Sequence, residues 1–118
     1  MSSKIQQRLA MLGLVLPPAP APVGNYVAHA RAGNLLFISG QLSRGDDGII
    51  AGVLGGGLDV ARGQAAARLC ALNILAQAKA ALGDLDRIVQ VLRLTGFVAS
   101  APGFTEQPQV VNGACLCA

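Results

Sequence analysis

The sequence predicts an α+β domain in which a mixed sheet is covered on one face by two helices. Three observations predict this class: a hairpin pattern within residues 23–41, an Ala-rich helical stretch over 59–82, and an apolar, β-branched run over 86–100. Strand and helix patterns that follow one another in a short chain are typical of helices packed on a sheet. With 118 residues, the chain has room for one domain and its core, but not for two.

The N-terminal part, residues 1–18, is predicted to be a helix and a linker, and residues 19–118 are predicted to form the main domain. The helix should run from about Ser3 to Leu12 and end at Gly13. Polar residues interrupt its apolar stretch, which argues against a signal peptide. No apolar run reaches the roughly 18 residues of a membrane span, so we expect the cytosol.

The prolines at positions 17, 18, 20 and 22 predict an extended connector, because each proline fixes φ and disfavours helix before it. Residues 23–32 then alternate in polarity, which places Tyr26 on one face of a strand and His29 on the other. Gly33 and Asn34 supply turn chemistry before the apolar run 35–38. This pattern predicts a hairpin leading into a central strand.

A Gly-rich stretch over 52–57 precedes a helix that should begin near Asp59. Such a loop could cradle a phosphate through its backbone N–H groups. No complete phosphate-loop motif is present, however, and an aspartate at the helix start would repel an anion. A flexible crossover loop is the favoured interpretation.

The helix predicted over 59–82 carries two apolar stripes, so it should be covered on more than one side, and Gly83 should end it. The run over 86–100 is apolar with weak alternation, as is typical of an internal strand buried on both faces. Residues 104–114 predict the start of a second helix that is short.

Charge and cysteine content exclude several function classes. The net charge of +3 comes from nine Lys and Arg spread along the chain, whereas nucleic-acid binding needs clustered cations. Cys70 is interpreted as a small buried hydrophobe, and Cys115 and Cys117 as free thiols at the C-terminus. Neither a redox C-x-x-C motif nor a set of metal ligands is present, so no metal is expected.

The order and spacing of several motifs resemble the Rid (reactive-intermediate deaminase) family, also called the YjgF-like or endoribonuclease L-PSP family. The motifs are the Pro-rich APAPVGNYVAHA, the FISGQL strand, Arg68 five residues before Asn73, LDRIV entering the long strand, and VNG in the following helix. The resemblance covers residues 19–114. It points to a subgroup outside the RidA branch, with an N-terminal helix and a Gly-rich loop before the long helix.

The resemblance implies a chorismate-mutase-like fold and a homotrimer with small-molecule clefts between subunits, and it implies no cofactor. RidA-type members hydrolyse enamine or imine products, using an arginine for the substrate carboxylate and a glutamate to position water. The positions that match the family's ligand-binding cleft are Tyr26, Ser39, Gly40 and Asn112. Arg62 is no substitute for the arginine, because it belongs to the first long helix.

Each of these positions also has a plain structural interpretation. Tyr26 could be a half-buried strand residue, Ser39 could satisfy a strand end, and Gly40 could allow close backbone approach. Asn112 lies beside an unusual C-terminus. His29, which has no acid or nucleophile near it in the motif, is interpreted as structural.

The departure from the family pattern begins after Ala114, where relatives continue the helix and add two strands bearing the arginine and the glutamate. This chain instead reads CLCA, and we expect a frameshifted or prematurely terminated reading frame. The long strand should then expose apolar surface and an unpaired edge. Two function classes stay open: an imine deaminase, inactive or impaired as this short chain, and a non-catalytic module that binds a small molecule or a partner through the same cleft.

Overall fold

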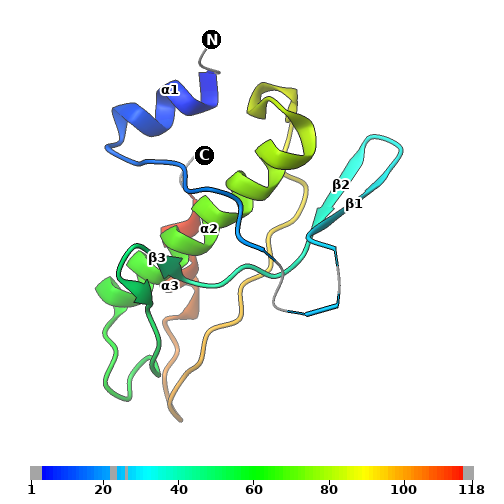
Figure 1. The fold of residues 1–118 in the computed structure, drawn as a ribbon. Coiled ribbons are helices and arrows are strands. Elements are labelled where there is room, and N and C mark those ends of the chain that lie inside the picture. Colours follow the sequence, from blue (N-terminus) through cyan, green and yellow to red (C-terminus); the bar gives the residue numbers. More distant parts are fainter. Residues whose placement is uncertain (1–3, 22–23, 26, 116–118) are drawn as a thin grey trace. The chain divides into compact units, whose positions relative to one another are not determined.

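The computed structural model describes residues 4–21, 24–25 and 27–115 of the chain, and it divides into two compact units. Unit 1 comprises Met1–Gln41 and Leu72–Gln90, and unit 2 comprises Leu42–Ala71 and Val91–Ala118. The elements follow one another as α1 (Lys4–Met11), β1 (His29–Ala32), β2 (Leu35–Ile38), β3 (Arg44–Gly45), β4 (Gly48–Ile49), α2 (Val60–Leu82), η1 (Leu85–Arg87), α3 (Gln107–Val111) and η2 (Asn112–Ala114) (Figure 1). Helices and antiparallel strands together give the α+β class that the sequence predicts.

Helix α1 forms within the predicted range and ends in a Schellman motif. Gly13 adopts a φ of 72°, its N–H donates to the Ala10 carbonyl at 3.0 Å, and the Leu14 N–H donates to the Leu9 carbonyl at 2.9 Å. These two bonds satisfy carbonyls that the last helical turn leaves open. Leu9 is buried, as is Leu85 of η1, the element that α1 contacts in unit 1.

The predicted hairpin is confirmed as β1 and β2, an antiparallel pair in which His29 lies opposite Ile38 and Ala32 opposite Leu35. Gly33 has a φ of 60°, and no residue other than glycine among those described has a positive φ. A glycine with positive φ at the first turn position is the requirement of a type II′ turn, whose twist matches the two strands.

Helix α2 agrees closely with the prediction over 59–82. The Asp59 carboxylate accepts the Arg62 N–H at 2.8 Å at its start, and the Gly83 N–H donates to the Lys79 carbonyl at 2.7 Å at its end. In unit 1 the helix buries Leu72 and Ala76, and the buried Gln77 donates to the carbonyl of Pro20 in the connector.

In unit 2, the short helix α3 packs on the first turns of α2. A methyl group added to Gly63 would lie 2.9 Å from the side chain of Leu54 and 3.1 Å from that of Val110. The Gln64 side chain also donates to the Gln109 carbonyl at 2.9 Å. The second helix is therefore present and short, as predicted.

Two features of unit 2 differ from the sequence prediction. Residues 44–49, interpreted as part of a loop, form the hairpin of β3 and β4, closed by a bond of 2.7 Å from the Ser43 hydroxyl to the Ile50 carbonyl. The strand predicted over 86–100 is wrong for the described structure. Its first residues belong to η1, and the remainder enters no ladder except one parallel bridge between Leu54 and Ser100. A strand needs a neighbour for its backbone hydrogen bonds, and the described residues supply none for 88–98.

Candidate functional site

The end of β2 places two polar side chains in contact at the position of the candidate cleft residues. Gln41 Nε2 lies 3.1 Å from the Ser39 carbonyl oxygen and 3.2 Å from Ser39 Oγ. A carbonyl oxygen only accepts hydrogen bonds, so the amide of Gln41 must turn its NH₂ group toward Ser39. The hydroxyl oxygen of Ser39 therefore acts as an acceptor here, and its own hydrogen is left for another partner.

Ser39 is held by the ladder before it and by Gln41 after it. Its N–H donates to the Ala28 carbonyl at 2.9 Å, which extends the β1–β2 ladder by one residue, and its side chain is half-buried. Gly40 follows, exposed to solvent, and a methyl group built on it meets nothing within 4 Å. Within the described residues Gly40 is thus not required for close packing, and a ligand could approach its backbone.

Gln41 is the residue that sequence reasoning did not select. It was part of the quoted Ser39-Gly40-Gln41 run, but no chemistry was assigned to it. The signal was its spacing, since a glutamine two residues after a strand-end serine can fold back onto that serine's carbonyl and hydroxyl.

The remaining candidates are placed less fully. Tyr26 lies outside the described residues. Asn112 lies in unit 2, at the end of α3, where its N–H donates to the carbonyls of Pro108 and Val110 and its carbonyl accepts the Cys115 N–H at 3.1 Å. Its side chain is exposed, so the backbone closes the helix and the amide faces solvent.

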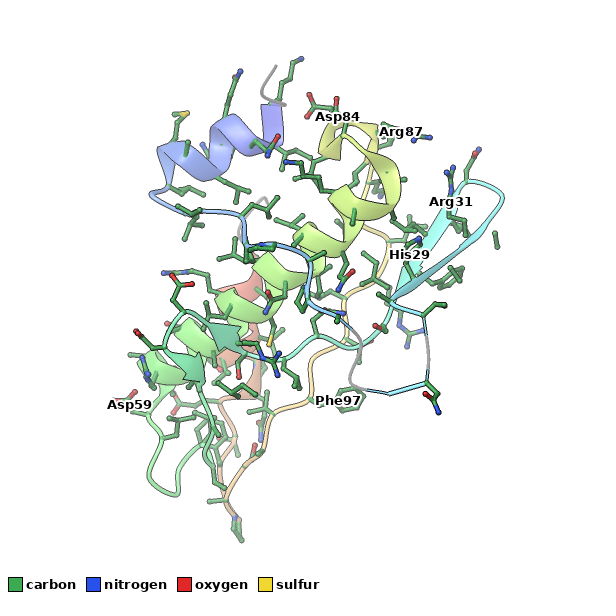
Figure 2. All side chains as sticks on the ribbon, in the orientation of Figure 1. His29, Arg31, Asp59, Asp84, Arg87 and Phe97 are labelled. Atoms are coloured by element: carbon green, nitrogen blue, oxygen red, sulfur yellow. The ribbon has the colours of Figure 1, made fainter. Side chains whose placement is uncertain are left out.

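His29 and Arg31 lie on one face of the hairpin, as the alternation predicted (Figure 2). They share that face with Leu36 and Ile38, whose side chains are half-buried. Ser39 follows Ile38 and so leaves the strand on the opposite face. The arginine of this hairpin is therefore not directed toward the Ser39 hydroxyl.

The Gly-rich loop does not present free amides to a phosphate. The Gly56 and Leu58 N–H groups both donate to the Val53 carbonyl, and the Gly55 N–H donates to the Leu58 carbonyl. At the start of α2, the Asp59 carboxylate already accepts the Arg62 N–H (Figure 2). These bonds use the donors that a phosphate would need, which favours a crossover loop.

Chemistry of other kinds has little support among the described residues. They contain no cluster of three or more His, Cys, Asp or Glu that could hold a metal ion. Burial raises the pKa of the Cys70 thiol above its ordinary value, and a backbone hydrogen bond offsets part of this rise, so Cys70 is a poor nucleophile. Within the described part of the chain, no helix has the length and hydropathy of a membrane span.

Comparison with known proteins identifies the family. The family model described as YjgF/chorismate mutase-like, putative endoribonuclease matches residues 6–117. Protein TCP17 of Trypanosoma cruzi is 50% identical over 114 residues, which are 96% of this chain and 71% of that protein.

Two solved structures share the fold. A protein of unknown function from Agrobacterium tumefaciens is 52% identical, with a TM-score of 0.84 over 93% of this chain and 67% of that one. A structure described as a putative endoribonuclease from Shewanella oneidensis is 38% identical, with a TM-score of 0.88 over 92% of this chain and 73% of that one. The chain therefore has the YjgF, chorismate-mutase-like fold and belongs to the YjgF/chorismate mutase-like family.

Proposed function

We propose that this chain carries part of a Rid-type site that takes a small, carboxylate-bearing imine or enamine, and that the 118-residue polypeptide hydrolyses this substrate poorly or not at all. The observation that carries the proposal is the contact between Ser39 and Gln41 in a member of this family. The contact leaves the Ser39 hydroxyl hydrogen available, at a strand end with open space over Gly40. A hydroxyl donor of this kind suits a carboxylate oxygen.

The charge around this strand end explains why hydrolysis should be weak. A bidentate arginine contributes about 1.5–3 kcal/mol per charge-assisted hydrogen bond, and a serine or tyrosine cannot replace its charge. Arg31 leaves the opposite face of the hairpin, and Arg62 and Arg68 belong to α2. Positioning of the substrate should therefore fall short of what turnover needs.

Ammonia release tests the proposal when an amino-acid oxidase or a serine/threonine dehydratase generates the imine in the assay. We expect the 118-residue polypeptide to match the rate without added protein. A chimera that adds the two strands implied by the family resemblance, taken from the Trypanosoma cruzi relative, should accelerate release, and Ser39→Ala should slow the chimera. Acceleration by the short polypeptide equal to that of the chimera would show that the arginine is dispensable.

A non-catalytic binding module is the second candidate, and the same absence of a cation beside Ser39 in unit 1 favours it. Binding of pyruvate, followed by changes in the amide resonances of Ser39, Gly40 and Gln41, would separate the two functions. Saturable binding by the 118-residue polypeptide, together with a chimera that binds equally but releases no ammonia faster, would favour the module.

Assembly into a homotrimer, with the site completed by neighbouring copies in the cytosol, is part of this proposal. The face of the hairpin on which Phe37 lies supports it. Its four residues, Ala30, Ala32, Leu35 and Phe37, are all apolar and all exposed in the single chain. An apolar face of this kind is normally covered by another surface. Light scattering should give three times the monomer mass, and Phe37→Ser should lower it.

A further inference from the structure

Residues 88–99 form an extended segment whose backbone is left open. The Ile88 N–H still bonds to η1 through the Leu85 carbonyl, and the Ala99 carbonyl accepts the Leu54 N–H at 2.8 Å. Between these two points, the described residues make no backbone-to-backbone hydrogen bond. Side chains along the segment are exposed as well, to 72% at Val91 and 95% at Phe97. Open backbone groups beside exposed apolar side chains are the features of an uncovered sheet edge.

The C-terminal part of this segment is fixed in place within unit 2. The Ala101 N–H donates to the Leu54 carbonyl at 2.8 Å, so Leu54 holds the backbone on both sides of Ser100. A methyl group on Gly96 would lie 2.9 Å from Val111 of α3, so this residue faces the helix. A segment that is already extended and anchored loses less conformational freedom when another strand pairs with it.

Alternation then assigns the two faces of the segment. Even-numbered residues share the face of Gly96, toward α3, and odd-numbered residues share the opposite face. That opposite face carries Val91, Arg93, Thr95 and Phe97, and Figure 2 shows Phe97 projecting from the segment. Arg93 is the one charged residue of 88–99 and it is exposed, so the open strand has an apolar surface with a single positive charge near its middle.

We propose that residues 91–97 accept an extended segment of another polypeptide by β-strand addition, and that the preferred segment is apolar with an acidic residue opposite Arg93. Main-chain hydrogen bonds supply affinity in this mode of recognition, and alternate side chains supply selectivity. A second copy of the chain is a poorer partner, because pairing centred on the middle of the segment would set Arg93 against Arg93. The proposal does not depend on imine chemistry.

A labelled peptide tests this charge selectivity without altering the protein. The probe is capped Val-Thr-Val-Glu-Val-Thr-Val, and its matched control has Lys in place of Glu. Fluorescence anisotropy with the full 118-residue chain should show saturable binding of the Glu peptide, and about 2- to 30-fold weaker binding of the Lys peptide. Arg93→Glu should reverse this preference. Equal affinity for the two peptides, or no binding of either, would refute the proposal.

A pair of proline variants tests whether the peptide adds to one edge. The N–H groups of adjacent strand residues point to opposite edges, so Val91→Pro and Leu92→Pro each remove a donor from a different edge. Only one variant should weaken binding of the Glu peptide, and circular dichroism would establish that both variants keep their helices. Equal weakening by both would exclude addition at one edge. Concentration-dependent self-association that excludes the peptide would identify a second copy as the occupant and overturn the proposal.

Discussion

The carboxylate of Asp86 accepts the backbone N–H of Lys4 at 2.9 Å across 82 residues of sequence. Its second oxygen accepts the Ile5 N–H at 3.2 Å. Both donors belong to the first turn of α1, where helical N–H groups have no partner within the helix, and a negative charge there also favours the helix dipole. Asp86 is itself positioned by Asp84, whose carboxylate accepts the Asp86 N–H at 2.9 Å. The N-terminal helix is thus joined to η1 through one side chain.

Replacement of Asp86 should loosen α1. Asp86→Ala removes both acceptors from the helix start, and we expect a loss of about 0.5–2 kcal/mol in the free energy of unfolding. Chemical denaturation measures the loss, and hydrogen exchange should accelerate first at the amides of α1. Asp47→Ala, in the exposed turn between β3 and β4, is the matched control and should leave both measurements unchanged. Equal effects of the two variants would show that the cap contributes nothing.

A methyl group at Gly113 should disrupt the packing of η2 on α2. The added carbon of Gly113→Ala would overlap the backbone carbonyl of Gln64, which cannot move without distorting the helix. Overpacking of this kind costs about 1–3 kcal/mol. Gly40→Ala, where the new methyl group meets nothing within 4 Å, should leave the melting temperature close to its original value. Both variants having the same melting temperature would contradict the close contact.

The hydrogen bond between Gln77 and Pro20 should hold the Pro-rich connector against α2. Gln77 is buried, and Gln77→Ala leaves the Pro20 carbonyl without this donor. We expect a net loss of about 0.5–1.5 kcal/mol, with faster exchange at Ala19 and Ala21 as the local sign. Gln7→Ala, on the exposed face of α1, makes the same change in helix propensity and serves as the control. No difference between the two variants would remove the proposed anchor.

Alkaline pH should destabilise the fold through Cys70. Desolvation raises the pKa of this thiol in the folded chain, and a backbone hydrogen bond offsets part of that rise. The folded state therefore keeps its proton more tightly than the unfolded state, so stability falls as pH rises past the ordinary thiol value of about 8.5. Denaturation between pH 7 and 10 should show this fall, and Cys70→Ala should reduce it. Cys115→Ala, at an exposed position, should not. A fall that survives Cys70→Ala would assign it to other groups.

The exposed thiol should also react before the half-buried one. Iodoacetamide at neutral pH is expected to label Cys115 faster than Cys70, because the reactive species is the thiolate and burial disfavours it at Cys70. Peptide mapping by mass spectrometry gives the order of labelling. Labelling of Cys70 first would indicate that α2 opens readily around it.

The sequence was sufficient for elements whose hydrogen bonds close locally. Helix α2 lies within one residue of its predicted start because Asp59 and Gly83 supply acceptors and donors at its two ends. The β1–β2 hairpin follows from Gly33, which alone satisfies the backbone of its turn. The order of such elements was also enough to suggest the family, which the match over residues 6–117 confirms.

Only the tertiary structure decided the state of residues 88–99, the contact of Gln41 with Ser39, and the cap that Asp86 provides for Lys4. Composition made 86–100 a good strand, but a strand depends on a partner that its own sequence does not contain, whereas a helix carries its partners within itself. The cap from Asp86 likewise joins residues far apart in the chain, and no local pattern could announce it. What the sequence determined by itself was therefore every element stabilised from within, and what the fold decided was every contact that two distant segments must share.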